Sequence, residues 1–212
     1  MQRPFAHKKL VSIVVCYKTD LKKFKDIIQK HISNFHHVIL VNNSPEISLD
    51  LFSTSKTSII KNQVNIGLSL SLNIGISEAK KQGFEAVALF DQDTELPSNF
   101  TQQMLYYINR YQGDKPVAVY SPVFHNHVIN ETSSHINFKP LRLVRSSVDE
   151  SDYAQPHYVI TSGSIIPMPV LDDVGLMREE LFIDFVDIEW CLRARQKDYE
   201  IVDVTNAYFT HS

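Results

Sequence analysis

Two carboxylates, Asp91 and Asp93, stand one residue apart directly after the apolar run of residues 86–90. Carboxylate oxygens are preferred ligands of hard divalent ions such as Mg²⁺ and Mn²⁺, and these ions in turn bridge the oxygens of a diphosphate. The other interpretation is that the pair ends a strand and caps a helix that begins near Pro97. An isolated D-x-D pattern is common, but its position after a buried strand favours a metal site.

A second acidic group surrounds Asp187, which lies three residues after Asp184 and three before Trp190. If a helix begins here, this spacing places the three side chains near one edge of a cleft. A carboxylate at a helix N-terminus stays ionised, and it can then act as a general base towards an acceptor hydroxyl. The alternatives are that Asp187 or Asp184 is only an N-cap, and that Trp190 belongs to the core instead of to the cleft.

Two glycine-containing segments are further candidates. Gly67, with Asn65 before it and Asn73 after it, permits a close backbone approach ahead of a helix N-terminus, which favours a nearby phosphate. The Thr-Ser-Gly-Ser segment that contains Ser162 and Gly163 has small side chains, so a sugar could lie close to it. The alternative for the first segment is a plain loop-to-helix turn, and for the second it is an ordinary tight turn.

The elements that must position these residues alternate between strands and helices. Short apolar runs rich in β-branched residues predict buried parallel strands, and apolar residues at helical spacing predict amphipathic helices. The expected strands are 11–17, 38–41, 57–61 and 86–90, and the expected helices are 21–35 and 69–82, the second ended by Gly83. This alternation predicts an α/β fold with a Rossmann-like, doubly wound, mostly parallel sheet and helices on both faces.

Polar residues follow several of the predicted strands at their carboxyl ends. They include Tyr17, Asn42, Asn43, Asp91 and Asp93. In doubly wound sheets, ligands bind outside the carboxyl ends of the strands. The polar residues therefore gather where this fold class predicts a site.

The second half of the sequence is less regular. Strands are expected at 117–122, 158–167, 182–183 and 200–209, and a helix at 187–197. The polar stretch 125–155 is long for an ordered loop, and it fits a flexible lid, an acceptor-reading segment or a variable insertion.

Composition bounds the class of protein. The chain has 212 residues, 43% of them hydrophobic and 21% charged, which suits one globular α/β domain. A formal net charge of −3 argues against nucleic acid as the main partner. Cys16 and Cys191 are expected to be free thiols, and no apolar run approaches the roughly 20 residues needed to cross a bilayer. We expect a cytoplasmic protein, and both contact with the inner face of a membrane and a homo-oligomer are compatible with the sequence.

Taken in order, these segments resemble family 2 inverting glycosyltransferases of the GT-A fold, and most closely the rhamnosyltransferase-like branch. The segment 65–75 is similar to the family's N-x-G-x-x-x-x-x-N pattern, and 89–97 (LFDQDTELP) to its DxD strand. The segment 182–195 (FIDFVDIEWCLRAR) is similar to the family's acidic base motif. Val186 stands where the family usually has a Glu before the base, and Asn42 where it usually has an Asp that contacts the nucleobase.

The resemblance implies a role for each matching residue. Asp187 would be the catalytic base. Asp91 would approach the ribose or the metal, Asp93 would hold the metal, and His211 would lie near the metal and diphosphate. The nucleotide would be bound by Tyr17, Asn42, Asn43, Asn65, Gly67, Asn73 and Asp91. The acceptor side would include Ser162, Gly163, Asp184, Glu189 and Trp190.

The function implied is transfer of a sugar from a nucleotide-sugar donor to a glycan or lipid-linked glycan acceptor in cell-surface polysaccharide synthesis, with Mg²⁺ or Mn²⁺. dTDP-rhamnose is the preferred donor and a UDP-hexose the next. Residues 10–110 would bind the nucleotide sugar, and a smaller subregion within 111–212 would bind the acceptor and supply the base. The whole chain 1–212 is expected to be one domain, compatible with a catalytic core trimmed at its C-terminus.

Two other functions fit parts of the sequence. A sugar-phosphate nucleotidyltransferase would also use a metal and a nucleotide, but such enzymes carry a glycine-rich loop after the first strand, and residues 17–20 contain no glycine. A non-catalytic, Mg²⁺-binding α/β module would explain Asp91 and Asp93 but leaves the segment 182–195 unexplained.

Overall fold

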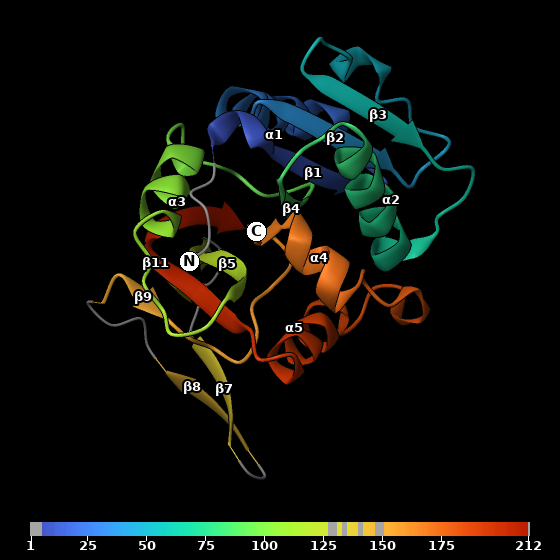
Figure 1. The fold of residues 1–212 in the computed structure, drawn as a ribbon. Coiled ribbons are helices and arrows are strands. Elements are labelled where there is room, and N and C mark those ends of the chain that lie inside the picture. The colour runs from blue at the N-terminus through green and yellow to red at the C-terminus, as the bar shows by residue number, and fades with distance from the viewer. Residues whose placement is uncertain (1–5, 127–130, 133–134, 140–141, 147–150, 212) are drawn as a thin grey trace.

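The computed structural model describes residues 6–126, 131–132, 135–139, 142–146 and 151–211, with side chains for 6–124 and 151–210. Its main sheet has the strand order β3-β2-β1-β4-β10-β5-β11-β9, with β6 paired to β5 (Figure 1). The first four strands are mutually parallel and span β1 Leu10–Cys16, β2 His37–Asn42, β3 Thr57–Lys61 and β4 Ala86–Asp91. The predicted first half of the sheet is therefore confirmed.

The interior strand β1 shows why these runs fold as they do. All seven of its residues are buried, and they alternate between the two faces of the sheet. Leu10 and Val14 join a core that includes Phe24 of helix α1 (Leu21–Asn34) and Phe100 of helix α3 (Phe100–Ile108). Val11, Ile13 and Val15 join the other core, together with Leu72 and Ile76 of helix α2 (Gly67–Lys81). Helices thus cover both faces, as the sequence predicts.

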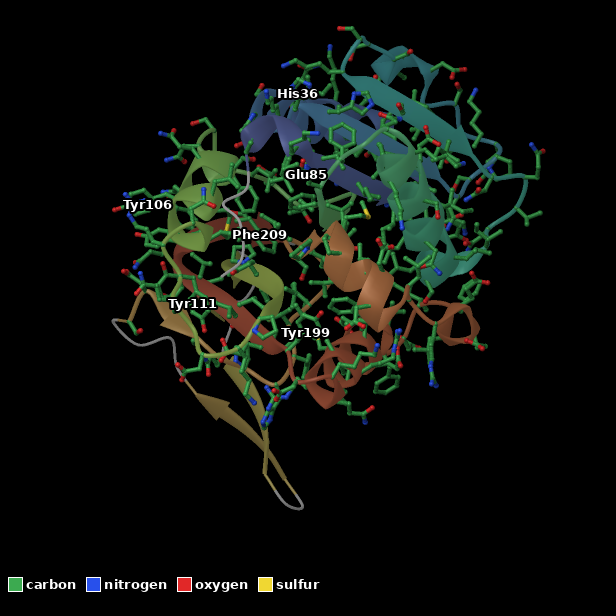
Figure 2. The ribbon with its side chains drawn as sticks, viewed as in Figure 1. His36, Glu85, Tyr106, Tyr111, Tyr199 and Phe209 are labelled. Carbon is green, nitrogen blue, oxygen red and sulfur yellow. The ribbon has the colours of Figure 1, made fainter. Side chains whose placement is uncertain are left out.

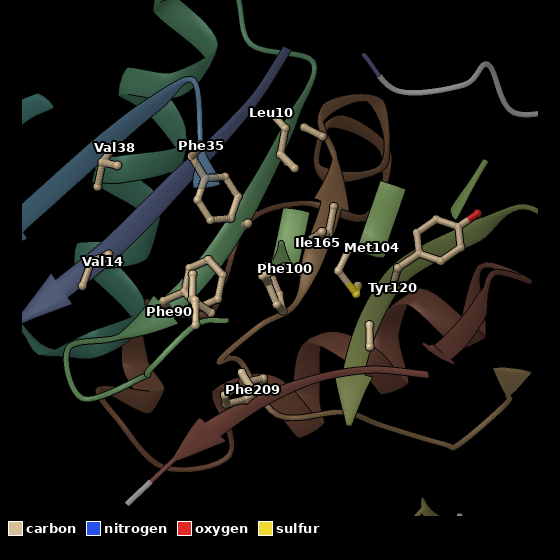
Figure 3. Packing of buried hydrophobic residues seen from close by; sticks show 14 of the residues in the cluster. Leu10, Val14, Phe35, Val38, Phe90, Phe100, Met104, Tyr120, Ile165 and Phe209 are labelled. Carbon is tan, nitrogen blue, oxygen red and sulfur yellow. The ribbon is translucent and has the colours of Figure 1, made fainter. Parts of the chain in front are cut away.

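The first core is rich in aromatic side chains beneath the end of β4. The ring of Phe90 lies 5.6 Å from that of Phe35 and 5.8 Å from that of Phe100, both at steep interplanar angles (Figure 3). Phe209 from the far end of the chain packs in the same cluster. This packing holds the end of β4 in place close to the residues that follow it.

The second half of the sheet is mixed. Strand β10 (Ile165–Pro167) lies antiparallel between β4 and β5 (Val117–Asn126), and β11 (Glu200–His211) runs parallel to β5. Helices α4 (Met168–Val174) and α5 (Val186–Gln196) cover the same face as α2. β10 pairs with β4 on one side and β5 on the other, and so joins the parallel strands β1 to β4 to the second half of the sheet.

The edge strand β9 (Tyr153–Ala154) pairs with β11 and is anchored by aromatic side chains. Tyr111 lies 5.0 Å from the ring of Tyr153, and the Tyr153 hydroxyl donates to the Tyr107 carbonyl at 2.9 Å. Tyr106 and Tyr111 lie on the α3 side of the molecule, whereas Tyr199 follows α5 (Figure 2). This cluster holds the chain as it leaves the polar stretch 125–155.

Several expected elements differ from the structure. The strand expected at 182–183 is wrong, because Glu179–Leu181 forms a 3₁₀ turn (η3) and Phe182 follows with a φ of 54°. Only Ile165–Pro167 of the expected strand 158–167 is extended within the sheet. The helix α4 was not expected, since its seven residues are too few to show a helical period.

The polar stretch 125–155 contains regular structure in the parts that are described. Besides the end of β5 and the edge strand β9, it contributes β6 (Glu131–Thr132) and a hairpin of β7 (His135–Lys139) with β8 (Arg142–Ser146). The hairpin projects away from the main sheet (Figure 1). The roles suggested for this stretch depend partly on residues outside the described part of the chain.

Both cysteines are free and buried, as expected. Among the described residues, none of the helices combines the length and apolar character that spanning a bilayer requires.

Candidate active site

One cavity brings the two predicted acidic segments together. It has a volume of about 270 Å³ and is lined by Leu68, Asp91, Phe124, Ile160, Thr161, Ile183, Val186 and Asp187. Asp91 ends β4 and Asp187 begins α5, so carboxylates far apart in the sequence share one space. Asp93 is not among the lining residues. The cavity therefore brings Asp187 together with Asp91, and a space shared by Asp187 and the expected metal ligand Asp93 stays a prediction.

The D-x-D pattern forms a turn, here called the DQD turn (residues 91–94). The Thr94 amide donates to the Asp91 carbonyl at 3.3 Å, which places Gln92 and Asp93 at the centre of the turn. Both aspartates are partly buried. Glu95 forms an isolated bridge with Thr210, so the end of β11 lies beside this turn.

That bridge bears on His211, the last residue of β11. Its neighbour Thr210 exchanges two backbone hydrogen bonds with Glu95, at 2.9 and 3.0 Å. The backbone of His211 therefore comes close to the DQD turn, but its side chain lies outside the described part of the structure. A contact with a metal or a diphosphate stays a prediction.

His31 of α1 supports the DQD turn from within the core. Its Nε2 lies 3.3 Å from the Thr94 carbonyl oxygen, and its Nδ1 lies 3.0 Å from the Ser12 hydroxyl. Because a carbonyl can only accept, Nε2 carries the proton and Nδ1 accepts from Ser12. Burial lowers the pKa of His31 to about 4, so the imidazole is neutral at neutral pH.

Asp187 is the second residue of α5 and is partly buried. Its Oδ1 accepts from the Ile188 amide at 2.8 Å, and the Thr161 amide donates a second backbone hydrogen bond to the carboxylate. Burial raises the pKa of Asp187 above its ordinary value of 3.8, although these hydrogen bonds oppose the rise. Burial therefore shifts the pKa of Asp187 in the direction opposite to the one expected for a carboxylate at a helix N-terminus.

The backbone before Asp187 has an unusual conformation. Phe182 has φ 54° and ψ −66°, and the Ile183 amide donates to the Leu181 carbonyl at 2.6 Å, which makes a γ-turn. Phe185 is in the left-handed region at φ 64°. Positive φ at such bulky residues is rare and costs free energy, so neighbouring contacts must hold this base segment (residues 182–187).

The first of those contacts involves the N-terminus of α2. The Leu68 and Ser69 amides both donate to the Phe182 carbonyl, at 2.6 and 3.1 Å. Gly67 has φ 83°, and a Cβ there would lie 2.6 Å from the Phe182 ring. The expected close approach at Gly67 therefore occurs, but to the chain's own Phe182, and these two amides are not available to a phosphate.

Asn73 provides the second contact. Its Nδ2 donates to the Met177 carbonyl at 2.9 Å and its Oδ1 accepts from the Met177 amide at 3.0 Å. This pair holds the chain that leads into the base segment. The described contacts give Asn73 a structural role, and its direct contact with a nucleotide stays a prediction.

The asparagines after β2 also shape their own loops. Asn42 accepts from the Ser44 amide at 2.9 Å and donates to the Ile47 carbonyl at 2.6 Å. Asn43 donates to the Gly67 carbonyl at 3.0 Å, while both side chains are only 2% exposed. Asn65, which is exposed, accepts from the Gly67 amide at 3.0 Å. Their contact with a nucleotide stays a prediction, as does that of Tyr17, which is 42% exposed.

Ser162 and Gly163, expected on the acceptor side, pack inside the molecule. The Ser162 hydroxyl lies 2.5 Å from the Thr94 hydroxyl and accepts from the Asp91 amide at 3.3 Å, and Ser162 is 1% exposed. A Cβ at Gly163 would lie 2.7 Å from the ring of Pro122. This segment therefore supports the DQD turn, while the preceding Thr161 lines the cavity.

The remaining acidic and aromatic candidates differ in whether they line the cavity. Glu189 is held by Arg193 through two contacts of 2.9 Å and by Arg178 at 3.2 Å, so its carboxylate is neutralised in ion pairs. Trp190 is 2% exposed and donates to the Gly175 carbonyl, so it belongs to the core and does not stack on a sugar. Asp184 is exposed and does not line the cavity. Of the acidic residues in this motif, Asp187 alone lines the cavity.

Ile183 and Gln92 were not among the predicted site residues, whereas Thr161 belongs to the Thr-Ser-Gly-Ser segment expected on the acceptor side. Thr161 and Ile183 line the cavity, and Gln92 hydrogen-bonds the backbone of Tyr17. Gln92 could have been found from its position between the two aspartates. Ile183 could not, because its exposure depends on the γ-turn before it.

Comparisons with known proteins agree with this geometry. A relative in Shigella flexneri, "dTDP-rhamnosyl transferase RfbF", is 30% identical over 193 residues, which are 87% of this chain and 62% of that protein. The chain therefore spans somewhat less than two thirds of the length of this curated relative.

Solved structures show the same fold at low sequence identity. A crystal structure of GalNAc-T7 with UDP, GalNAc and Mn²⁺ matches with a TM-score of 0.72 at 12% identity, covering 95% of this chain and 43% of that one. A structure of residues 1–349 of TarS from S. aureus in complex with UDP-GlcNAc matches with a TM-score of 0.69 at 16% identity, covering 95% and 57%. The mixed sheet is thus that of GT-A glycosyltransferases.

A family model also matches most of the chain. Residues 12–175, which include β1 to β4 and the DQD turn, match the family described as Glycosyl transferase family 2. This match covers more than half of the chain, and it places the protein in glycosyl transferase family 2.

Proposed function

We propose that this chain is the catalytic unit of an inverting glycosyltransferase that moves rhamnose from dTDP-rhamnose to a glycan or lipid-linked glycan acceptor. The observation that carries the proposal is the single cavity lined by both Asp91 and Asp187. Membership of family 2 and the similarity to a dTDP-rhamnosyl transferase support the reaction class and the donor. A lipid-linked acceptor in cell-surface polysaccharide synthesis would place the reaction at the cytoplasmic face of a membrane.

The donor side of the site would lie at the DQD turn. Asp91 and Asp93 offer hard oxygen ligands on one turn, and among the described residues no cluster of three or more metal-ligating side chains is present. Mg²⁺ characteristically binds one or two carboxylates and completes its shell with water and substrate phosphates. The residues therefore fit a Mg²⁺ or Mn²⁺ ion carried with a diphosphate, which would neutralise the charge on the departing nucleoside diphosphate.

The nucleoside would lie over the carboxyl ends of β1 and β2. Tyr17 presents a partly exposed ring there, and Asn42 and Asn43 shape the adjacent loop. Ligands of doubly wound sheets bind at this edge. Residues 10–110 would thus hold the donor, and residues 111–212 would supply the acceptor side and the base.

The acceptor hydroxyl would be activated by Asp187. The amides of Thr161 and Ile188 orient its carboxylate within the cavity, and Asp187 removes the hydroxyl proton as that oxygen attacks the anomeric carbon. A single displacement from the face opposite the leaving group inverts the anomeric centre. Because burial raises the pKa of Asp187, activity should fall with acidification at a higher pH than an ordinary carboxyl would cause.

The test is turnover with a panel of donors. The protein is incubated with dTDP-rhamnose or UDP-hexoses, with and without Mn²⁺, and release of the nucleoside diphosphate is measured with and without a glycan acceptor. Metal-dependent release of dTDP from dTDP-rhamnose supports the proposal. Release of pyrophosphate from a nucleoside triphosphate and a sugar phosphate would indicate a nucleotidyltransferase, and no turnover with any donor would indicate a non-catalytic module.

A further inference from the structure

Gln92, which stands between the two aspartates of the DQD turn, makes three hydrogen bonds to the loop that follows β1. The Gln92 Nε2 donates to the Tyr17 carbonyl at 2.8 Å, and its Oε1 accepts from the Tyr17 amide at 3.1 Å. The same Oε1 accepts from the Thr19 hydroxyl at 2.6 Å. One side-chain amide therefore pairs with both backbone groups of Tyr17, as a neighbouring strand would.

This pairing extends the contact between β1 and β4 beyond their last paired residues. β1 and β4 are parallel neighbours, and their ladder ends where Val15 lies opposite Asp91. Beyond that point the backbone turns away at the DQD turn, and the Gln92 side chain takes over the hydrogen bonds of Tyr17. The side chain thus joins the two strand ends at the edge where the donor would bind.

Tyr17 and Lys18, the first two residues of this loop, are exposed, whereas Thr19 is buried. The Tyr17 side chain is 42% exposed, so the hydrophobic core does not hold it. Lys18 has φ 48°, and its amide donates to the Ser44 hydroxyl at 2.6 Å. Hydrogen bonds to Gln92 and Ser44 therefore contribute to holding the exposed part of this loop in its conformation.

We propose that Gln92 is a positioning residue that couples the nucleoside-binding loop at Tyr17 to the DQD turn. The inference rests on the proposed function and goes further. It assigns to Gln92 the alignment of the donor's nucleobase with its diphosphate. Asp93 acts on the diphosphate, whereas Gln92 acts on the nucleoside through Tyr17. Loss of Gln92 should therefore weaken binding of a nucleoside that carries no phosphate at all.

The side chain has to be an amide for this role. Gln92→Glu keeps an acceptor for the Tyr17 amide and the Thr19 hydroxyl, but it places a carboxylate oxygen against the Tyr17 carbonyl and removes the donor. Gln92→Leu has a similar volume and removes all three hydrogen bonds. Gln29→Leu makes the same substitution at an exposed position of α1 and serves as the matched control.

The experiment titrates the purified chain and its variants with thymidine, and with dTDP plus Mn²⁺, followed by NMR. Gln92→Leu should weaken thymidine binding roughly fivefold to tenfold, the scale of one net hydrogen bond. Asp93→Ala should leave thymidine binding unchanged and weaken only dTDP, and Gln29→Leu should change neither. Equal thymidine binding by wild type and Gln92→Leu overturns the inference.

A second measurement separates this inference from the proposed function. Hydrogen exchange at the Tyr17 amide, measured without any ligand, should be slow in the wild type and become faster in Gln92→Leu but not in Gln29→Leu. If the wild type binds no nucleoside or nucleotide, the proposed function fails even when exchange behaves as expected. If binding is normal and exchange at Tyr17 is unchanged by the substitution, the coupling through Gln92 is refuted while the proposed function stands.

Discussion

The DQD turn and the base segment both deliver a carboxylate to the cavity, but their supports differ. The DQD turn extends a buried strand that is paired on both sides, and His31 and Ser162 hydrogen-bond to it from the core. The base segment contains two bulky residues at positive φ and is held by the N-terminus of α2 and by the Asn73–Met177 pair. The donor side is thus fixed by the sheet, whereas the base side depends on a few loop contacts.

The largest expected effect comes from removing the base itself. Asp187→Asn keeps the shape of the side chain but cannot accept the acceptor proton, so transfer should fall by about 10²–10⁴-fold. Binding of dTDP with Mn²⁺ should stay near the wild-type level, because the DQD turn is untouched. Steady-state kinetics and calorimetry check both statements. Wild-type turnover would move the base elsewhere, and Asp184 would be the next residue to test, since Glu189 is held in ion pairs.

Asp93→Ala should affect binding of dTDP, which Asp187→Asn leaves near the wild-type level. Loss of a ligand carboxylate should weaken Mn²⁺-dependent binding of dTDP by roughly tenfold or more, equivalent to about 1.4 kcal/mol. Calorimetry with and without Mn²⁺ measures this directly. Equal affinity under both conditions in the wild type would contradict the proposed metal site at the DQD turn.

Gly67→Ala tests how the base segment is held. At φ 83° an added Cβ would lie 2.6 Å from the Phe182 ring, so both the backbone and Phe182 must shift. We expect a loss of stability of about 1–3 kcal/mol and a lower kcat with little change in dTDP binding. Gly83→Ala is the matched control, because its φ is 80° but an added Cβ meets nothing within 4 Å. If both variants lose kcat equally, contact with Phe182 does not position the base.

Acid should loosen the support of the DQD turn through His31. Its pKa is about 4 in the folded protein against 6.5 ordinarily, so between these values the unfolded chain binds more protons than the folded one. Stability should therefore decrease as pH falls from 6.5 towards 4, with a slope of up to about 1.4 kcal/mol per pH unit from this group. Denaturant unfolding across this range measures it, and His31→Gln should remove that part of the slope.

The smallest expected effect comes from changing Ser162, whose hydroxyl supports the DQD turn. Ser162→Ala removes the hydroxyl that hydrogen-bonds the Asp91 amide and Thr94, and should cost about 1 kcal/mol with a modest rise in the Mn²⁺ needed for activity. Ser164→Ala is the matched control, since that buried hydroxyl donates to the Ile160 carbonyl instead. A similar metal requirement in both variants would argue that Ser162 contributes to stability only.

The regular part of the fold could be predicted from the sequence. The apolar runs that became β1, β2 and β4 are buried on both faces, and burial of that kind leaves a local pattern within a few residues. The positions of Asp91 after a strand and Asp187 at the start of a helix follow from the same patterns. These predictions succeeded because the signal lies within each segment.

The environment of most polar residues could not be predicted in this way. Asn73 matched a nucleotide-binding pattern, yet its described partner is the backbone of Met177. Glu189 is neutralised by Arg178 and Arg193, and Phe182 adopts a γ-turn where a strand was expected. Most of these partners are too distant in the sequence to be part of the local pattern that predicts a helix or strand.

The sequence by itself determined the α/β alternation, the acidic residues and their place at the ends of elements, because burial and periodicity are local properties of the chain. Only the tertiary structure decided that Asp91 and Asp187 share a cavity, that Gln92 joins two strand ends, and that Trp190 is core. Those outcomes depend on which distant groups come within hydrogen-bonding or van der Waals distance once the sheet is assembled, and no local pattern carries that information.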